Sequence, residues 1–317
     1  MIQIFTHANY DFVGKRRWYY ALSILGVLIS LGSLIAHRGL AYGIDFSGGF
    51  LLQVRYERPV SVETVRRGLD RVGAADAVIQ QFGGADEYLI RVPRQVEGPQ
   101  IEALNRRVRA ALSETSRVAV EIRRAEFVGA QVGQDLQMQA VYAIGAAVLG
   151  ILIYLAIRFD FRGGVVATAA IAHDVIVSLG ALSLTGRELS LPVLAALLTI
   201  VGYSINDTIV VFDRIRERRA AALARSRTLA ALVNEAINQT LSRTVLTSFT
   251  TFLAAFVLFV FGGEVLNDFA FALVVGIVTG TYSSVAASAV LLDWETWRAR
   301  RRRTAAAVRS VSDRGNA

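Results

Sequence analysis

The most constraining feature of this sequence is an apolar stretch, residues 191–219, that contains an aspartate. The stretch reads LPVLAALLTIVGYSINDTIVVFDRIRERR and opens with enough apolar residues to cross a bilayer. Asp207 lies inside it, beside Asn206 and one helical turn after Tyr203 and Ser204. A carboxylate on a membrane helix costs about 2.5–3.5 kcal/mol on insertion scales and is expected to face protein or water. Other parts of the chain must therefore surround it.

Composition places the chain among integral membrane proteins. Hydrophobic residues make up 54% of the sequence and charged residues 19%, and the mean hydropathy is +0.45, well above that of an ordinary globular domain. The sequence contains no cysteine, which excludes disulfides and thiolate metal sites. Its three histidines are too scattered to form a metal cluster. We expect no metal and no cofactor.

Six apolar runs predict six membrane spans. The first, residues 18–36, follows a short polar start that ends in Lys15, Arg16 and Arg17. A signal peptide has a similar pattern, but no convincing A-x-A-type cleavage site follows, so an uncleaved span is expected. The other spans are expected at 138–157, 165–185, 192–212, 244–262 and 269–292. A charged helical stretch, 213–243, separates the fourth span from the fifth.

Residues 41–137 differ in kind, because they are charged throughout and contain no run long enough to cross a membrane. Strands are expected at 50–56, 76–82, 86–92 and 117–128, helices at 61–72 and 99–112, and a turn at Gly83-Gly84. This βαββαβ order is typical of a ferredoxin-like α+β domain. The expected domains are thus 1–40 with the first span, the inserted 41–137, spans two to six over 138–297, and a basic, disordered tail, 298–317.

The distribution of basic residues predicts the orientation in the membrane. With the N-terminus inside, the cytoplasmic segments hold the basic start, the 158–164 hinge, the arginines between 214 and 243, and the tail. The two short outer loops hold only Arg187. This asymmetry follows the positive-inside rule, so both termini are expected in the cytoplasm and the 41–137 domain outside. It also accounts for the net charge of +8 without a nucleic-acid partner.

Other spans also carry polar residues. His173 and Asp174 are adjacent in the third span, within reach of Thr168 and Ser178. The start of the fifth span is rich in hydroxyl groups, and helical spacing predicts one shared face for Thr240, Arg243, Thr244, Thr247, Thr250 and Thr251. In the sixth span, four small residues at four-residue spacing predict a face for close helix packing: Gly276, Gly280, Ser284 and Ser288.

Each of these patterns also has an ordinary structural interpretation. Hydroxyl groups on membrane helices commonly bond to their own backbone, and small-residue faces commonly serve packing alone. His173 can simply orient Asp174. Asp207 and Asp174 are harder to explain in this way, because a carboxylate buried only for structure is expensive.

Five segments together resemble the SecD/SecF family of bacterial protein-export membrane proteins, and its SecF branch in particular, within the resistance-nodulation-division superfamily. They are GIDFSGG (43–49), AHDVIVSLG (172–180), GYSINDTIVVFDRIRE (202–217), NQTLSRTVLTSFTT (238–251) and GGEVLNDFAFALVVGIVTGTYSS (262–284). Their combination in this order is highly specific, although none is so alone. One departure is Ala130, where the family usually has proline, just before the second span.

The resemblance implies a six-span helical bundle of the resistance-nodulation-division type in the bacterial cytoplasmic membrane, with a periplasmic domain between the first two spans. It implies SecD as a pseudo-symmetric partner with six more spans, together with the SecYEG translocon and the exported polypeptide. It also implies that protons drive a late stage of export, with the family's coupling pair falling on Asp207 and Arg243.

The remaining candidate site residues are assigned by position. Asp174 is a second candidate for proton coupling. The candidates for supporting polar groups are His173, Tyr203, Ser204, Asn206 and Thr247.

Two other functions fit a membrane protein with intramembrane acids. One is a stand-alone exporter of lipid or drug-like molecules, although such exporters usually carry two six-span halves in one chain. The other is an intramembrane aspartyl protease that uses Asp174 and Asp207 as a dyad. The G-x-G-D pattern of such proteases is absent, and the local sequences are AHD and IND.

Overall fold

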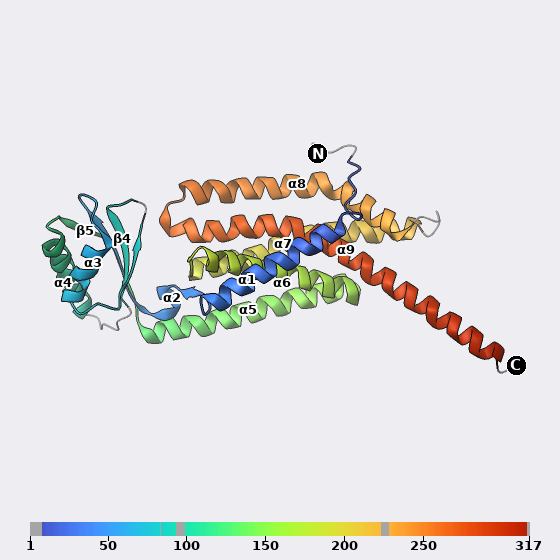
Figure 1. Ribbon diagram of the computed structural model, residues 1–317, viewed down its shortest axis with the longest axis horizontal. Helices are drawn as coiled ribbons and strands as arrows, with labels where there is room; N and C mark the ends of the chain where they lie inside the picture. The colour runs from blue at the N-terminus through green and yellow to red at the C-terminus, as the bar shows by residue number, and fades with distance from the viewer. Residues whose placement is uncertain (1–7, 83, 93–98, 223–227, 316–317) are drawn as a thin grey trace.

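The computed structural model describes residues 8–82, 84–92, 99–222 and 228–315 and consists of an α/β domain at one end of a bundle of long helices (Figure 1). Within these residues, six helices are long and apolar enough to cross a membrane. α1 (Arg16–Ala36) starts at the end of the bundle far from the α/β domain and leads into that domain. The expected fold class, a six-span helical membrane bundle with an inserted α+β domain, is confirmed.

The bundle helices extend beyond the apolar runs that predicted them. After the α/β domain they are α5 (Ala130–Arg158), α6 (Phe161–Leu184), α7 (Leu191–Ala222), α8 (Leu229–Phe261) and α9 (Glu264–Gly315). The charged stretch 213–243 is therefore not a separate helix but the end of α7 and the beginning of α8. α9 likewise continues as a helix to Gly315, so the expected disorder of the basic tail is wrong. Alanine and arginine are both strong helix formers, and the tail is rich in them.

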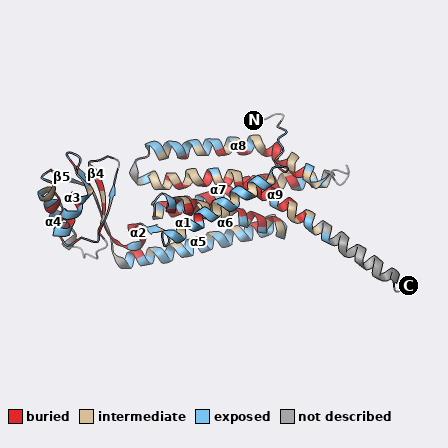
Figure 2. Cartoon of the chain, in the orientation of Figure 1, coloured by how far each residue is buried: buried red, intermediate tan, exposed pale blue. Residues whose placement is uncertain are grey.

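α7 is the central helix of the bundle. In its most apolar segment 56% of the residues are buried, compared with 6% in α5. α6, α8 and α9 pack against α7, whereas α1 packs mainly on α6. α1 and α5 expose rows of large apolar side chains, as expected of helices that face lipid (Figure 2).

The α/β domain has the expected split βαβ arrangement. Its strands are β2 (Gly49–Tyr56), β3 (Val78–Gln81), β4 (Glu87–Val92) and β5 (Val120–Val128), and its helices are α3 (Val62–Arg71) and α4 (Pro99–Ser116). The sheet is antiparallel in the order β3-β4-β2-β5. β2 is therefore a central strand, paired on both sides. The predicted turn at Gly83-Gly84 includes residue 83, which lies outside the described residues.

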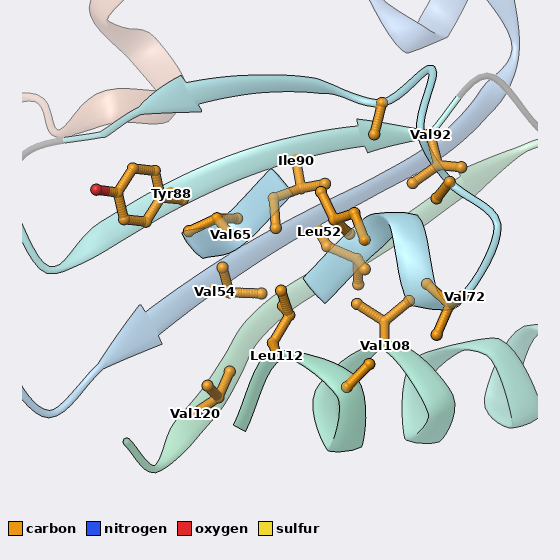
Figure 3. Packing of buried hydrophobic residues seen from close by; sticks show 14 of the residues in the cluster. Leu52, Val54, Val65, Val72, Tyr88, Ile90, Val92, Val108, Leu112 and Val120 are labelled. Carbon is orange, nitrogen blue, oxygen red and sulfur yellow. The ribbon is translucent and has the colours of Figure 1, made fainter. Parts of the chain in front are cut away.

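The core of this domain forms because alternate residues of each strand point to the same face. Phe50, Leu52 and Val54 of β2 are fully buried under α3 and α4 (Figure 3). Ser61 is the N-cap of α3, and its hydroxyl oxygen accepts a hydrogen bond from the backbone N–H of Thr64. The other face of the sheet is turned towards the bundle.

A small structure that the sequence did not predict joins the domain to the bundle. β1 (Ala41–Tyr42) pairs in parallel with β6 (Glu188–Leu189), which lies between α6 and α7. A one-turn helix, α2 (Ile44–Ser47), follows β1 and packs on the start of α5. Strands of two residues carry no periodicity that a sequence can reveal.

Burial in the α/β domain gives a first prediction. A fragment comprising residues 49–128 should unfold cooperatively in denaturant. Leu52→Ala should lower its free energy of unfolding by about 2–5 kcal/mol, because it leaves a cavity under two helices. Val78→Ala is the control, since Val78 is 54% exposed and should change stability by less than about 0.5 kcal/mol. Absence of a cooperative transition in the parent fragment would mean that the bundle is needed for the domain to fold.

Candidate functional site

Two carboxylates are buried in the middle of the bundle. Asp174 on α6 is 1% exposed and Asp207 on α7 is 2% exposed. Asp207 lies on the most enclosed helix, and α6, which carries Asp174, is far more enclosed than α1 or α5, so the bundle shields both carboxylates from lipid. Hydroxyl groups, rather than cations, are their nearest partners in the structure.

Asp174 lies at a junction of three helices. Its Oδ2 accepts hydrogen bonds from the hydroxyl of Ser204 on α7 at 2.5 Å and from that of Ser283 on α9 at 2.7 Å. Its Oδ1 lies 2.9 Å from Nδ1 of His173, whose side chain is 15% exposed. Asp174 thus binds α6, α7 and α9 together, and His173 completes its contacts.

Asp207 has a sparser environment. Its Oδ2 accepts a hydrogen bond from the hydroxyl of Ser248 on α8 at 3.1 Å. Ser204 lies one helical turn before Asp207 on α7. A single turn of α7 therefore contacts both Asp174 on α6, through Ser204, and Ser248 on α8, through Asp207. The side chain of Asn206 is the second hydrogen-bond partner of Asp207. An ionised carboxylate can accept about four hydrogen bonds, so Asp207 keeps free capacity for a proton or a cation.

Arg243 is placed on α8 and is exposed. Within the described residues its guanidinium makes no hydrogen bond and no ion pair, although its backbone carbonyl accepts a bond from the hydroxyl of Thr247 at 2.9 Å. It precedes Ser248, the partner of Asp207, by little more than one turn. The pair is therefore on adjacent helices but is not joined in this conformation.

The other candidates are divided between the interior and the surface. Tyr203 is half-buried, and its hydroxyl is enclosed without a hydrogen-bond partner. Asn206 is exposed on α7, and Thr247 is half-buried with its hydroxyl bonded to its own helix. His173 and Ser204 contact Asp174, and the side chain of Asn206 is a hydrogen-bond partner of Asp207.

The single hydroxyl face expected on α8 is wrong. Of its members, Thr240 and Thr244 are buried, as is Ser248 four residues further on, whereas Thr247 is half-buried. Arg243, Thr250 and Thr251 are exposed. A spacing of three and four spreads residues over a wide arc, so that half of it faces the bundle and half faces away.

Ser248 and Ser283 are the functional candidates that sequence reasoning missed. Both hold a carboxylate, yet serine is common in membrane helices for packing and hydrogen-bonds its own backbone there. For Ser248, its four-residue spacing from Thr244 and Thr240 was a signal available in the sequence. Ser283 lies beside the small-residue face of α9 rather than on it.

That small-residue face lies against α7. A methyl group added to Gly280 would lie 3.1 Å from Cβ of Ser204, and one added to Gly276 would overlap Ile200. Ser284 and Ser288 are fully buried, and the hydroxyl of Ser288 donates to the carbonyl of Ser284. Close approach of α7 and α9 therefore depends on the absence of side chains at these positions.

Taken together, the fold and the buried acids define a class: a multi-pass membrane protein whose bundle keeps ionisable groups away from lipid and carries an α/β domain at one end. No group of residues suited to hold a metal ion occurs in the part of the chain that the structure describes.

Comparison with known proteins identifies the family. The model for "Protein export membrane protein SecD/SecF, C-terminal" matches residues 107–297, and the model for "SecD/SecF GG Motif" matches residues 33–60. The chain is 47% identical to protein translocase subunit SecF of Calditerrivibrio nitroreducens, over 88% of this chain and 91% of that protein. It is 43% identical to SecF of Thermodesulfovibrio yellowstonii, over 92% and 97%. The chain belongs to the SecD/SecF family.

A solved structure supports the same assignment. The chain is similar to the crystal structure of SecDF from Thermus thermophilus, described as a translocon-associated membrane protein, with a TM-score of 0.81 and 42% identity. The match covers 92% of this chain and 39% of that one, so this chain spans less than half of the solved protein.

The α7–α9 contact gives a second prediction. Gly280→Leu should lower the thermal stability of the detergent-purified protein, because overpacking costs about 1–3 kcal/mol and displaces Ser204 from Asp174. Gly150→Leu is the matched control, since a side chain at Gly150 on α5 would meet nothing within 4 Å. Equal melting temperatures for the two variants would mean that the α9 face does not depend on small residues.

Proposed function

We propose that this chain is a SecF-type subunit of a protein-export complex, in which movement of protons through the bundle promotes late stages of export across the cytoplasmic membrane. One observation carries the proposal: Asp207 is buried on the most enclosed helix, and its hydroxyl partner Ser248 lies on the same adjacent helix as Arg243, which forms no ion pair among the described residues. The names of the relatives, subunits of a protein translocase, support it.

The chemistry follows from the two states of the acid. Protonated, Asp207 is neutral and can donate a hydrogen bond to Ser248. Ionised, it is an acceptor only and attracts a guanidinium. A shift that brings Arg243 towards Asp207 therefore stabilises the carboxylate and releases its proton, and withdrawal of Arg243 allows a proton to bind again. Each charge that crosses is worth about 2.3 kcal/mol per 100 mV, enough to bias a movement between two conformations.

We propose SecD as the partner that covers the outer surface of α7 and α8. Polar groups on the outer surface of α7 and α8, among them Arg243, Asn206 and Thr250, are exposed although both helices are apolar enough to span a membrane. Such groups are expensive against lipid, so a second helical bundle should cover them. The larger SecDF chain, of which this chain matches 39%, has residues to supply one.

The proposed orientation in the membrane follows from the positive-inside rule. Basic side chains gather at the end of the bundle far from the α/β domain. There Arg158 pairs with Asp213, Arg219 with Glu295, and Arg16 with Asp293. We place this end in the cytoplasm and the α/β domain in the periplasm, where it meets the exported polypeptide. We place the SecYEG translocon beside the complex.

The geometry does not favour the protease alternative. Among the described residues, no hydrogen bond joins Asp174 to Asp207, and the two carboxylates have separate partners on different helices. A protease dyad requires two carboxyl groups that share a proton. SecF proteins match this chain over nearly their full length, which favours the subunit over the stand-alone exporter.

Substitution of Asp207 tests the proposal. Asp207→Asn preserves shape and hydrogen bonding but cannot titrate. It should assemble normally and lose the increase in export that a proton gradient produces in membrane vesicles. Asp135→Asn is the control, because Asp135 is exposed on α5 and its loss should leave the response unchanged. A full response in Asp207→Asn vesicles would exclude this residue and make Asp174 the next candidate.

Arg243→Lys extends the test to the second member of the pair. Lysine retains the positive charge but lacks the planar fork that binds a carboxylate in two places. The gradient response should therefore fall between those of the parent and Asp207→Asn. A response equal to the parent's would mean that charge alone suffices.

Labelling tests the orientation, which is simple because the chain has no cysteine. Ala75→Cys in the α/β domain should react with a membrane-impermeant maleimide in cells whose outer membrane is permeabilised and whose inner membrane is intact. Trp297→Cys on α9, where the tryptophan is 49% exposed, should react only after the inner membrane is opened. The opposite pattern would reverse the proposed orientation.

A further inference from the structure

The GIDFSGG segment, residues 43–49, has a definite place in the structure that the proton site does not explain. It contains α2 and connects β1 to β2, at the junction between the bundle and the α/β domain. Most of the segment is buried, namely Gly43, Ile44, Phe46, Gly48 and Gly49. The segment is attached to three different elements, namely two helices of the bundle, α7 and α5, and the strand β2 of the α/β domain.

The first attachment is to the start of α7. Oδ2 of Asp45 accepts a hydrogen bond from the backbone N–H of Leu191, the first residue of α7, at 2.9 Å. The N–H of Gly43 donates to the carbonyl of Leu189 at 2.8 Å and extends the pairing of β1 with β6. A carboxylate at this end of a helix satisfies a free N–H group and interacts favourably with the helix dipole.

The second attachment is to the start of α5. The side-chain amide of Gln137 donates to the carbonyl of Phe46 at 2.6 Å. Gly133 approaches so closely that an added methyl group would lie 3.1 Å from the backbone nitrogen of Gly48. α2 is therefore fixed on α5 by a hydrogen bond and by direct backbone contact.

The third attachment is covalent and leads into the sheet. Gly48 and Gly49 have φ values of 66° and 115°, a region that favours glycine, and they turn the chain directly from α2 into β2. β2 is paired on both sides, so a displacement of its first residue moves the whole sheet. A second link runs in parallel, because Arg91 of β4 forms an ion pair with Glu188 of β6, and both side chains are largely buried.

These links lie at the margins of a cleft. The cleft, of about 690 Å³, lies between the open face of the sheet and the base of the bundle and is lined by residues of both, among them Leu51, Leu89 and Pro192. The sheet is thus not packed flat against the bundle. The domain is held to the bundle chiefly through its connecting segments and the Arg91–Glu188 pair.

We propose that residues 43–49 form a rigid joint through which α7 transmits its position to the α/β domain, with Asp45 as the positioning residue that fixes the joint to the helix. This rests on the proposed function, since it is the charge state of Asp207 that would displace α7. Asp207 lies about 24 Å along α7 from Leu191 at 1.5 Å per residue. Because α7 is one continuous helix over this length, an axial shift at Asp207 carries Leu191 with it and passes through Asp45 into β2.

Two substitutions at one position test the role of Asp45. Asp45→Ala removes the acceptor for the Leu191 N–H, and gradient-dependent export should fall by about tenfold, as for the loss of a charge-assisted hydrogen bond. Asp45→Asn keeps a side-chain oxygen at the same place and should retain most of the export. Parental export in Asp45→Ala, or equal loss in both variants, would overturn the proposal.

A covalent replacement for the lost attachment separates a joint from a merely structural role. Tyr42 and Leu189 are partners in the β1–β6 pairing, and the chain has no other cysteine. In the Asp45→Ala background, an oxidised Tyr42→Cys/Leu189→Cys disulfide should restore gradient-dependent export, and reductant should abolish it again. The control for loss of packing is the reduced Tyr42→Cys/Leu189→Cys variant with Asp45 retained. Failure of the disulfide to restore export, or loss of export on oxidation in the parent, would contradict a rigid joint.

Labelling of Asp207 distinguishes failure of the joint from failure of the proposed function. Dicyclohexylcarbodiimide reacts with protonated carboxyl groups in membranes, and the label that Asp207→Asn lacks is the signal of Asp207. Asp45→Ala should keep this signal and its pH dependence while export falls. If Asp45→Ala changed the pH dependence of labelling as well, Asp45 would act on the proton site rather than on transmission, and the joint would be refuted. If Asp207→Asn itself responded to the gradient, the proton site would be wrong.

Discussion

The cost of placing a carboxylate inside a bilayer governs this structure. Two such groups, Asp174 and Asp207, require protein around them, because lipid offers neither hydrogen bonds nor counter-charges. The bundle meets this requirement by enclosing α7 between α6, α8 and α9 and leaving α1 and α5 to face lipid. Hydroxyl groups from three helices then satisfy the carboxylates. The arrangement of the helices is thus a consequence of where the acids lie.

Packing and polar satisfaction are inseparable at the centre of the bundle. Ser204 is the residue that Gly280 of α9 approaches, and its hydroxyl is also one of the donors to Asp174. A shift of α7 against α9 would therefore change a van der Waals contact and a buried hydrogen bond together. Because an unsatisfied buried carboxylate is costly, such a shift is resisted unless α6 moves as well. α6, α7 and α9 consequently behave as one block, held by Asp174.

Sequence reasoning recovered the parts of the structure that depend on periodicity and length. The six spans and the βαββαβ order follow from local patterns, and the structure contains them. It failed where a feature depends on contacts between distant segments. The β1–β6 pairing joins residues far apart in the chain, and nothing in a two-residue strand predicts its partner. Ser248 and Ser283 resemble every other serine of a membrane helix until their neighbours are known. The one-face interpretation of α8 failed because residues three and four apart cover an arc wide enough to be half buried and half exposed.

α8 is anchored to the bundle over only half of its length, unlike the block of α6, α7 and α9, and can therefore respond to a change at Asp207. Its first half is anchored, since Leu232, Val233 and Ala236 are buried in the bundle core, and Asn234 and Asn238 bind the backbone of residues 10–13. Its second half exposes Phe249, Leu253 and Phe256. Ser248, which contacts Asp207, lies where the anchored half gives way to the exposed half, and Arg243 lies just before it. Protonation of Asp207 alters one hydrogen bond at this boundary while the Asp174 cluster stays intact. In the proposed function, a proton that binds Asp207 therefore acts on the least restrained part of the interface, between α8 and the block that carries α7.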